Sequence, residues 1–308
     1  MIATGSVGDG GTAAEYMVKR TARRPAVAPQ SAMLDYGGGM DPDGKVIVVT
    51  GAAGGIGGAL VRALLERGAR SVVAADLDGG GVERLSEELG AGRVLPRVLD
   101  VSDEQATRAL VGEIEGTVGA IDVWFANAGL ATGSGPDAPD EEWNSQWRIN
   151  VMSHVYAARV LLPGWIERGE GHLVTTASMA GLLTTAGDAA YSATKHAAVG
   201  FAEWLAFTYA GDGVRVSCIC PGAVDTAMLR AGGEGDAARA SAVIGGGDVL
   251  EPEQAAERIL EDLQLDLFLI LTHPQMHEFV VGKAQDPQRW IRGMTKLWAR
   301  AQALLAGQ

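Results

Sequence analysis

The sequence predicts an α/β fold: a three-layer, doubly wound parallel sheet of about seven strands with helices on both faces. Three observations predict it. Short apolar runs alternate with segments of helical spacing from Lys45 onward, and a glycine-rich turn joins the first run to the first helix. The chain has 308 residues, 47% hydrophobic and 20% charged, so it can bury a large core without disulfides or structural metals.

The strands are expected at the apolar runs. Residues 46–49 form a continuous Val-Ile-Val-Val run bounded by turn residues, as in a strand covered on both faces. The later strands are expected at residues 71–75, 94–99, 121–125, 173–176, 214–219 and 267–271.

Helical spacing fills the intervals between these runs. Leu60, Leu64 and Leu65 recur on one face of the first helix. The next helices are expected through Leu85 and Leu89, through Leu110, Val111 and Ile114, at about 141–166 and at about 191–209. Strict alternation of strand and helix implies right-handed crossovers, and therefore parallel strands.

The start of the chain differs from its middle. Residues 1–43 are rich in Gly, Ala, Ser and Pro and lack periodicity, so they are expected to form a flexible N-terminal extension. A docking tail, or a chain that starts at Met33 or Met40, is the alternative. Residues 44–308 are expected to form a single domain.

Two segments of this domain follow the motifs described below. Residues from about 226 to 250 are rich in Gly and Ala and are expected to form a lid over a ligand. Residues from about 273 to 308 form a C-terminal tail, in which Trp290 and Trp298 lie two helical turns apart. This spacing indicates core or a subunit interface rather than a ligand site.

Charge and cysteine content limit the partners and the location. The net charge of −13 argues against a nucleic-acid partner, because a duplex-binding surface needs clustered Lys and Arg. No apolar run approaches the about 20 residues of a membrane helix, and the N-terminus does not resemble a secretory signal. Cys218 and Cys220 are expected to share one strand face and stay reduced, so a cytoplasmic protein without a membrane partner is predicted.

The glycine-rich turn has the sequence Thr50-Gly51-Ala52-Ala53-Gly54-Gly55-Ile56-Gly57-Gly58. Glycines allow the tight turn and let the backbone approach a pyrophosphate, while the helix N-terminus supplies N–H groups and a positive dipole end. Strand, turn and helix together predict a dinucleotide site. Tight packing alone is the alternative.

Asp76 indicates which dinucleotide is bound. It closes the second strand, 19 residues after Gly57. A carboxylate here accepts hydrogen bonds from the adenosine ribose and repels a 2′-phosphate, and neither Leu77 nor Gly54 offers a compensating cation. NAD is therefore predicted rather than NADP, unless Asp76 merely caps the following helix.

Ser178, Tyr191 and Lys195 form a candidate catalytic set. Tyr191 and Lys195 are four residues apart, which places them on one helix face. A phenol titrates near pKa 10, so its use as a general acid/base near neutrality requires a nearby positive charge. Ser178 follows the fifth strand, where open α/β sheets bind ligands, and its hydroxyl could hold the substrate oxygen.

Further motifs follow in order along the chain: Asp100-Val101, Asn127-Ala128-Gly129, Asn150 and Pro221-Gly222 with Thr226. With them, residues from about 45 to 272 resemble the short-chain dehydrogenase/reductase family, which has a Rossmann fold and uses NAD(P). The N-terminal extension and the C-terminal tail depart from the family pattern.

The resemblance implies residue roles. The catalytic set would be Asn150, Ser178, Tyr191 and Lys195, in which Asn150 bends its helix and holds a water that links Lys195 to solvent. The cofactor would be bound by Gly51, Gly55, Ile56, Gly57, Asp76, Leu77, Asp100, Val101, Asn127, Ala128, Gly129, Tyr191, Lys195, Pro221, Gly222, Val224 and Thr226.

The resemblance also favours a homodimer or homotetramer. It would form through the long helices after the fourth and fifth strands. The faces expected to take part carry Val151, Val155, Val160, Phe201, Trp204 and Leu205.

The expected substrate site is mostly apolar. Its candidate walls are Leu130 and Ala131, Met179 to Ala186, and Met228 to Leu229, with Thr184 and Thr185 as polar exceptions. The candidate substrate residues are Ser178, Tyr191, Met179 and Met228. No Lys or Arg stands in these segments to bind a carboxylate or phosphate, so an apolar and bulky, for example steroid-like, secondary alcohol or its ketone is predicted. Alternatively, these side chains pack only on each other.

Metal chemistry is not expected. His154, His172, His273 and His277 show no ligand-like cluster, and His196 is interpreted as structural. The predicted function is NAD-dependent hydride transfer between an apolar secondary alcohol and its ketone, with Tyr191 as general acid/base. An NAD-dependent epimerase or dehydratase, or a non-catalytic nucleotide-binding protein, is the alternative.

Overall fold

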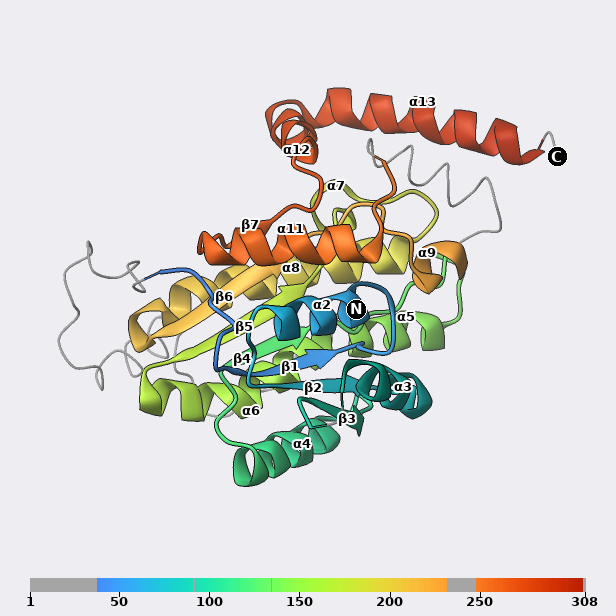
Figure 1. Cartoon of the computed structure of the whole chain (residues 1–308). Coiled ribbons are helices and arrows are strands. Elements are labelled where there is room, and N and C mark those ends of the chain that lie inside the picture. The colour runs from blue at the N-terminus through green and yellow to red at the C-terminus, as the bar shows by residue number, and fades with distance from the viewer. Residues whose placement is uncertain (1–37, 91, 134, 232–247, 307–308) are drawn as a thin grey trace, which may run out of the picture. The chain divides into compact units, whose positions relative to one another are not determined.

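Parallel strands form one sheet in the computed structural model, which describes residues 38–90, 92–133, 135–231 and 248–306. Within these residues the sheet has seven strands in the order β3-β2-β1-β4-β5-β6-β7 (Figure 1). The strands are Val46–Thr50 (β1), Ser71–Asp76 (β2), Val94–Val98 (β3), Val123–Ala126 (β4), Gly171–Thr176 (β5), Val214–Ile219 (β6) and Leu269–Ile270 (β7). The doubly wound parallel sheet predicted from the sequence is confirmed.

Helices connect these strands. They are Gly55–Glu66 (α2), Gly79–Leu89 (α3), Glu104–Thr117 (α4), Asp140–Trp147 (α5), Ser153–Arg168 (α6), Ala180–Leu183 (α7), Ala189–Tyr209 (α8), Ala227–Ala231 (α9), Pro252–Gln264 (α11), Met276–Gln285 (α12) and Pro287–Ala306 (α13). Short π and 3₁₀ segments lie at Arg148–Met152 (η2) and Ala210–Asp212 (η3).

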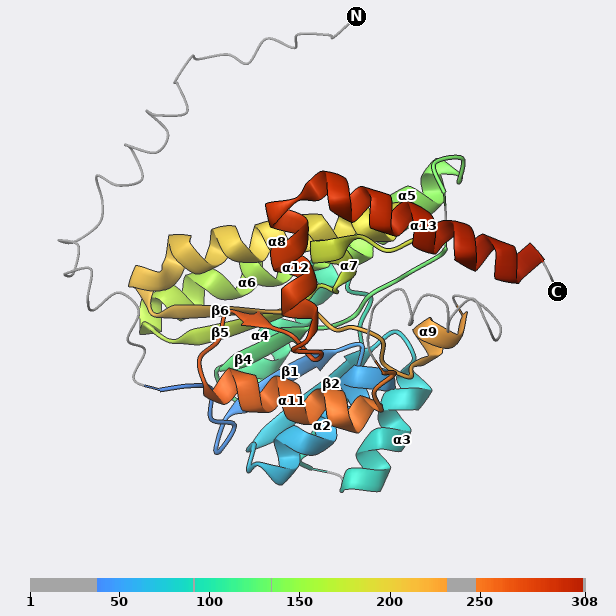
Figure 2. The ribbon, with the colours of Figure 1, turned by 90° about the horizontal axis from the view of Figure 1, so that it is seen from above.

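Each face of the sheet has its own core, because successive residues of a strand point to opposite faces. Val46 and Val48 of β1 pack on one face with residues of α4, α6 and α8. Ile47 and Val49 pack on the other face with residues of α2, α3 and α11. Figure 2 shows α6 and α8 on one side of the sheet and α2 and α11 on the other. Burial on both faces explains why this run has no polar alternation.

The strand order reverses at β1. The chain proceeds from β1 to β2 and β3 on one side, and then returns to place β4 on the other side of β1. Val48 is accordingly in register with Val73 of β2 and with Trp124 of β4. At the carboxyl ends of β1 and β4, the connection after β1 therefore runs toward one side of the sheet and the connection after β4 runs toward the other. Open α/β sheets bind ligands at such a position.

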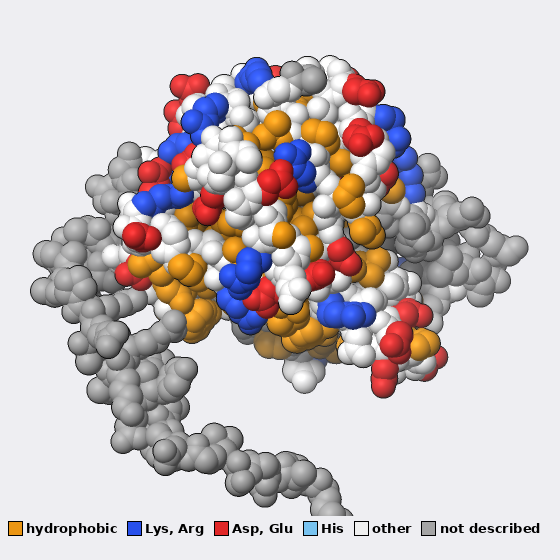
Figure 3. Space-filling view, turned by 90° about the horizontal axis from the view of Figure 1, so that it is seen from below, with side chains coloured by type: hydrophobic (Ala, Val, Ile, Leu, Met, Phe, Trp, Pro, Cys, Tyr) orange, Lys and Arg blue, Asp and Glu red, His pale blue; other side chains and the backbone are white. Residues whose placement is uncertain are grey.

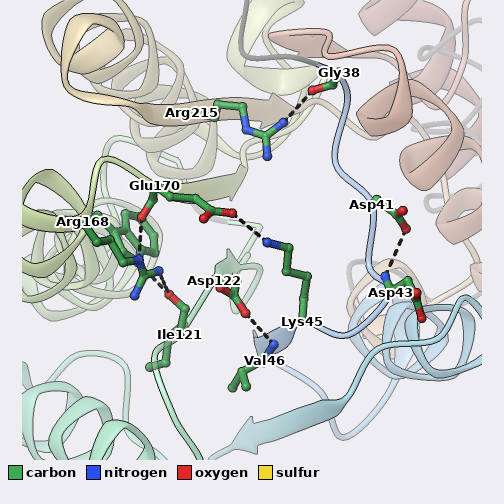
Figure 4. A network of polar contacts seen from close by, with 11 residues as sticks. Gly38, Asp41, Asp43, Lys45, Val46, Ile121, Asp122, Arg168, Glu170 and Arg215 are labelled. Atoms are coloured by element: carbon green, nitrogen blue, oxygen red, sulfur yellow. Dashed lines mark hydrogen bonds and ion pairs between the residues drawn. The ribbon is translucent and has the colours of Figure 1, made fainter.

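The opposite, amino-terminal edge of the sheet is held by polar contacts (Figure 4). Asp122, just before β4, accepts a hydrogen bond from the backbone N–H of Val46 at 2.8 Å. Lys45 forms a 2.7 Å ion pair with Glu170, which precedes β5. These contacts tie together the starts of β1, β4 and β5, whose other ends carry the predicted site.

The domain begins earlier than the boundary at residue 44 expected from the sequence. Met40 is 1% exposed, and its N–H donates to the carbonyl oxygen of Leu263 at 2.9 Å. Residues 38–43 therefore belong to the domain, held by backbone contacts that leave no hydrophobic periodicity in the sequence. The rest of the expected extension, residues 1–37, lies outside the described residues.

The long helix expected at about 141–166 is composite. It consists of α5, the π-helical η2 and α6. A π-helical turn holds one extra residue, which the 3.6-residue spacing of a sequence does not reveal. Asn150 lies in η2, where the resemblance implies a bend.

The C-terminal tail expected at about 273–308 consists largely of α12 and α13. Trp290 packs against the core, whereas Trp298 remains 39% exposed. Of the expected lid, α9 and residues 248–250 are described, and residues 232–247 lie outside the described residues.

Two residues expected on the oligomer faces lie in the core instead. Val151 and Leu205 are 7% and 2% exposed. Trp204 and Phe207, both exposed, form the apolar surface that α8 presents to solvent. Because α8 is apolar on several sides, its spacing alone could not tell which side meets the sheet.

The surface view in Figure 3 shows Lys and Arg side chains interspersed with Asp and Glu rather than gathered into a basic stripe. None of the described helices has the length and apolar character needed to cross a bilayer. Likewise, the described part of the chain contains no group of three His, Cys, Asp or Glu side chains that could hold a metal ion.

Candidate active site

The residues predicted to be catalytic come together beyond the end of β5. Lys195 Nζ donates a 2.9 Å hydrogen bond to the carbonyl of Thr176, the last residue of β5. The same ammonium lies 5.5 Å from the centre of the Tyr191 ring, as expected for residues one turn apart on α8. Ser178 hydrogen-bonds the Tyr191 side chain. The serine, tyrosine and lysine are thus contiguous.

The pKa of Tyr191 is raised above its usual value. Burial of the phenol is the largest cause, and electrostatic interactions with Asp188 and Cys220 also raise this pKa, while the hydrogen bond with Ser178 lowers it. The positive charge that acid/base use of Tyr191 requires, expected from Lys195 together with the nicotinamide cation, would act in the opposite direction and lower this pKa. In the protein alone burial is the largest cause, even though part of the tyrosine remains exposed.

Lys195 is the buried cation of the site. It is 2% exposed, and this burial lowers its pKa to about 8. Interactions with Cys218 and Cys220 act in the opposite sense and raise the pKa of Lys195. Cys218 of β6 and Cys220 just after it are unbridged and buried in the same core cluster, on one side of the sheet as the sequence predicts. A lysine with a pKa near 8 changes charge within the working range of most enzymes, as functional groups often do.

Asn150 ties η2 to the loop after β4. Its Oδ1 accepts a hydrogen bond from the N–H of Leu130, and its Nδ2 donates to the carbonyl of Leu130, both at 2.8 Å. Nδ2 also donates to Thr194 Oγ1 at 3.1 Å. A Cβ on Gly129 would lie 3.4 Å from both Asn150 Oδ1 and Lys195 Nζ. Asn150 and the lysine therefore border the same small space.

Asn127 connects the carboxyl ends of three strands. Its Nδ2 donates to the carbonyl of Thr50 at 3.0 Å, and its Oδ1 accepts from Thr176 Oγ1 at 3.3 Å. The Thr50 hydroxyl in turn accepts from the N–H groups of Asn127 and Ala128. The ends of β1, β4 and β5 are thereby fixed relative to one another.

The glycine-rich turn is closely packed. A Cβ at Gly57 would lie 2.0 Å from the carbonyl oxygen of Gly51, and one at Gly51 would lie 2.9 Å from Ala128 Cα. Gly51 also has a φ of 69°, a left-handed conformation that favours glycine. The predicted glycines are therefore required by the geometry of the turn itself.

Asp76 lies beside this turn. Its Oδ2 accepts a hydrogen bond from the N–H of Ala53, and its Oδ1 accepts from the N–H of Asp78, each at 3.0 Å. Helix α3 is capped by Asp78, not by Asp76, since the Asp78 side chain accepts from the N–H of Gly81. The alternative interpretation, in which Asp76 caps the helix, is therefore wrong.

The segment from Pro221 to Thr226 lies against the glycine-rich turn. A Cβ at Gly55 would lie 2.9 Å from Thr226 Cγ2, and Ile56 packs with the buried Val224. A Cβ at Gly222 would lie 2.5 Å from His273 Nδ1. The structure thus brings three predicted cofactor segments together at one edge of the sheet. They are the glycine-rich turn, Asn127 to Gly129, and Pro221 to Thr226.

Other predicted residues lie at the ends of β2 and β3. Leu77 is 70% exposed and Val101 packs against the core. Asp100 is exposed, and its Oδ1 accepts a 2.9 Å hydrogen bond from the N–H of Ser102. Nothing in these contacts joins them to the catalytic set.

The two methionines predicted to contact substrate differ in position. Met179, the N-cap residue of α7, is 6% exposed and packs in the core. Met228 of α9 is 38% exposed, and its Cε lies 3.7 Å from the position of a Cβ on Gly129. Only Met228 therefore remains as an exposed candidate of the pair.

Several residues that hold the site together are not predicted from the sequence. Thr50 and Thr176 are two of them, and both contact Asn127. Asp188 accepts from the N–H of Tyr191, and His273 contacts Gly222. An Asp just before a helix does predict an N-cap, but the partners of the other three residues depend on tertiary contacts.

The chain matches the family model described as short chain dehydrogenase over residues 45–236. The chain belongs to this family. Its fold is also that of a short-chain dehydrogenase/reductase from Burkholderia phymatum solved in complex with NAD. The two share 29% identity with a TM-score of 0.73, covering 81% of this chain and 96% of that one.

Two curated relatives are dehydrogenases. The 1-deoxy-11-beta-hydroxypentalenate dehydrogenase of Streptomyces avermitilis is 38% identical over 260 residues, which is 82% of this chain and 93% of the relative. The 3beta-hydroxysteroid dehydrogenase 2 of Eggerthella lenta is 38% identical over 188 residues, 59% of this chain and 72% of the relative. This dehydrogenase is therefore an NAD(P)-dependent oxidoreductase that acts on CH–OH groups.

Proposed function

We propose that this dehydrogenase uses NAD to interconvert an apolar secondary alcohol and its ketone, with Tyr191 as general acid/base. The observation that carries the proposal is the position of Lys195 Nζ, 5.5 Å from the centre of the Tyr191 ring, while Ser178 hydrogen-bonds the same side chain. An acid/base, a cation and a hydroxyl thus converge at the carboxyl edge of the sheet.

The glycine-rich turn fits the pyrophosphate of a dinucleotide. Helix α2 begins without a side-chain cap, so its first-turn N–H groups point out of the helix toward the place of a ligand. Gly51, Gly55, Ile56 and Gly57 would hold the pyrophosphate, and Pro221 to Thr226 would border the nicotinamide end. When bound, the nicotinamide supplies the hydride acceptor for oxidation or the hydride donor for reduction.

Asp76 supports NAD over NADP. Its carboxylate is held in place by the N–H groups of Ala53 and Asp78. A carboxylate at this strand end accepts hydrogen bonds from ribose hydroxyls and repels a 2′-phosphate. The next side chain, Leu77, is exposed and carries no charge that could compensate.

Tyr191, Ser178 and Lys195 have different roles in the proton transfer. In the oxidation direction Tyr191 accepts the proton of the substrate hydroxyl, and in reduction it returns a proton to the carbonyl oxygen. Ser178 Oγ accepts from the N–H of Ala180 at 3.0 Å, which orients the hydroxyl and leaves its proton to be donated to the substrate oxygen. Lys195 would stabilise the phenolate, since its ammonium lies 5.5 Å from the centre of the Tyr191 ring and a nearby opposite charge favours the ionised form.

Asn150 would link this proton transfer to solvent. Asn150 and Lys195 border the same space beside Gly129, which supports the proton relay implied by the resemblance. The two 2.8 Å hydrogen bonds between Asn150 and Leu130 keep η2 in place while the relay operates.

The substrate is proposed to be a bulky apolar alcohol. Met228 lies close to Gly129, beside the catalytic set, and brings an apolar side chain to it. The two relatives named above act, by their names, on a hydroxypentalenate and on a 3beta-hydroxysteroid. Both names denote substrates that carry a hydroxyl group, and the absence of Lys and Arg from the predicted walls favours an uncharged substrate for this chain.

We also propose a homodimer or homotetramer. Trp204 and Phe207 of α8 are 41% and 70% exposed, and Ile166 of α6 is 39% exposed. Burying such apolar surface against a second copy is favourable. The cytoplasmic location stays a prediction.

The experiment that tests the proposed function follows the absorbance of reduced nicotinamide. NAD and NADP are supplied separately with a panel of cyclic and linear secondary alcohols, with Tyr191→Phe as the control. We expect turnover with NAD that the variant loses by at least about a hundredfold, while NAD binding persists. Turnover without net cofactor reduction would instead indicate an epimerase or dehydratase, and tight NAD binding without any turnover would indicate a non-catalytic binding protein.

A further inference from the structure

Asp188 joins the loop after β4 to the start of α8. Its Oδ2 accepts hydrogen bonds from the N–H groups of Thr132 and Gly133 at 3.0 and 2.8 Å. Its Oδ1 accepts a 2.9 Å hydrogen bond from the N–H of Tyr191. The residue is 7% exposed. One buried carboxylate thus holds the backbone of the predicted acid/base and of a loop 56 residues earlier in the chain.

Gln146 adds a third element to this network. Its Nε2, on α5, donates to Thr132 Oγ1 at 2.7 Å and to Asp188 Oδ1 at 3.4 Å. Gln146 is fully buried, and within the described part of the chain its Oε1 has no hydrogen-bond partner. Helix α5, the loop after β4 and the start of α8 therefore meet at Asp188.

Asp188 does more than cap a helix. Asp103 provides the comparison, since its side chain caps α4 by accepting from the N–H groups of Gln105 and Ala106 at 2.7 and 3.3 Å. That side chain is exposed and bonds only its own helix. One oxygen of Asp188 accepts from the backbone of its own helix, α8, and the other accepts from the loop after β4. Loss of the Asp188 carboxylate would therefore remove a link between α8 and this loop.

We propose that Asp188 is a positioning residue, which sets the placement of the loop at residues 130–133 relative to the Tyr191 side chain. This proposal rests on the proposed function, because it takes Tyr191 as the acid/base and the loop as a wall of the substrate site. The same loop carries Leu130, to which Asn150 is bonded. Asp188 and Asn150 thus hold the two ends of one short segment.

The charge of Asp188 gives the proposal a signature that packing alone lacks. The groups that face the Tyr191 phenol are Lys195 on α8, Ser178 after β5, Cys220 after β6 and Asp188 itself. Asp188 and Cys220 raise the pKa of the phenol and Ser178 lowers it. Removing the charge of Asp188 should therefore lower the pKa of Tyr191.

The test begins with Asp188→Asn in the full chain. The amide matches the carboxylate in size, but its nitrogen cannot accept from a backbone N–H, so either the loop or Tyr191 loses its contact. We expect kcat/KM for the alcohol to fall between about tenfold and a hundredfold, mainly in kcat. The pH at which kcat/KM is half-maximal should move to lower pH, while the Kd for NAD stays the same.

Two matched variants separate position from charge. Gln146→Leu removes the tie from α5 but keeps the charge of Asp188, so kcat/KM should fall while the pH profile stays in place. Asp103→Asn removes a helix cap whose hydrogen bonds go to Gln105 and Ala106, not to Tyr191 or the loop at residues 130–133, and should change neither. An unchanged kcat/KM in Gln146→Leu would contradict the proposal, and this variant decides the matter if Asp188→Asn does not fold.

A readout that needs no turnover distinguishes failure of this inference from failure of the proposed function. Tyrosinate absorbance is titrated in the wild type and in Asp188→Asn, and Tyr191→Phe versions of both are subtracted to isolate one phenol. A lower midpoint in Asp188→Asn supports the role of Asp188 whether or not a substrate is found. Equal midpoints, or a loss of NAD binding in parallel with activity, would overturn it.

Discussion

The ammonium of Lys195 and the backbone carbonyl of Thr176 are joined by a 2.9 Å hydrogen bond at the end of β5. This contact holds a cation inside the protein, 2% exposed, at the point where a parallel strand ends. A carbonyl dipole compensates only part of the lost hydration, and the pKa of Lys195 is lowered to about 8. The site therefore stores unfavourable free energy in a residue whose charge the chemistry needs.

This penalty predicts a stability that depends on pH. An unfolded lysine titrates near pKa 10.4, so between about pH 8 and pH 10.4 the unfolded chain binds more protons than the folded one. The contribution of Lys195 to the free energy of unfolding therefore rises with pH across this window, and the penalty is present in full below it. Its size is on the order of 3 kcal/mol, at about 1.4 kcal/mol per pKa unit.

Lys195→Met isolates this effect. We expect the free energy of unfolding of the variant, relative to that of the wild type, to decrease as pH rises from about 7 to 10. Urea unfolding at each pH gives the difference, and the exposed Lys296→Met controls for the loss of one surface cation. A difference between variant and wild type that stays constant with pH would show that burial does not perturb this lysine.

Asp76→Asn should relax the cofactor preference. The amide oxygen can still accept from the N–H of Ala53, but the negative charge that repels a 2′-phosphate is gone. We expect the ratio of kcat/KM for NADP to that for NAD to rise by about tenfold or more, since two like charges about 4 Å apart near a protein surface interact by about 4 kcal/mol. Asp78→Asn, two residues further along, is the matched control. A ratio that moves equally in both variants would contradict the role of Asp76.

The sequence predicts those parts of this fold that repeat or alternate. The bounds of β6 agree with the expected 214–219, and both faces of β1 are buried as its unbroken apolar run predicts. Asp76, Ser178 and Lys195 could be identified because each follows a strand or repeats at helical spacing. Such patterns depend on local geometry alone. Residues that follow different parallel strands then lie close together, because the carboxyl ends of these strands meet at the same edge of the sheet.

Features that depend on a distant partner were not predictable in the same way. Residues 38–43 look like part of a tail, yet the backbone of Met40 is bonded to Leu263, more than two hundred residues away. The sequence predicts Met179 as a residue lining the substrate site, but its side chain is buried in the core. The second oxygen of Asp188 bonds a loop that nothing in its neighbouring sequence specifies.

Asn150→Ala should weaken both the fold and the reaction. Its side chain bonds the N–H and the carbonyl of Leu130, and Asn150 is fully buried, so truncation leaves two backbone groups without partners. We expect a loss of about 1–3 kcal/mol in the free energy of unfolding, together with a lower kcat. Urea unfolding and steady-state kinetics measure the two effects. Ser153→Ala, at the start of α6, removes one hydrogen bond to Ile149 and serves as the control. A similar loss of kcat in both variants would argue against a specific role for Asn150.

Gly57→Ala and Gly54→Ala should have different effects, because an added Cβ meets a close contact at Gly57 and open space at Gly54. A Cβ at Gly57 would lie 2.0 Å from the carbonyl oxygen of Gly51, a backbone atom that cannot move without opening the turn. A Cβ at Gly54 would meet no atom within 4 Å, and the backbone there is extended, with a φ of −176°.

We expect Gly57→Ala to lower the free energy of unfolding by about 1–3 kcal/mol or more, as overpacking does, and to abolish NAD binding because the turn and the first turn of α2 move apart. Gly54→Ala should stay within about 0.5 kcal/mol of the wild type and retain NAD. Urea unfolding and a titration with NAD measure both. Loss of NAD binding in both variants would mean that the dinucleotide occupies the space beside Gly54. In that case the turn would bind NAD because Gly54 has no side chain, and not because of the backbone shape fixed by Gly51 and Gly57.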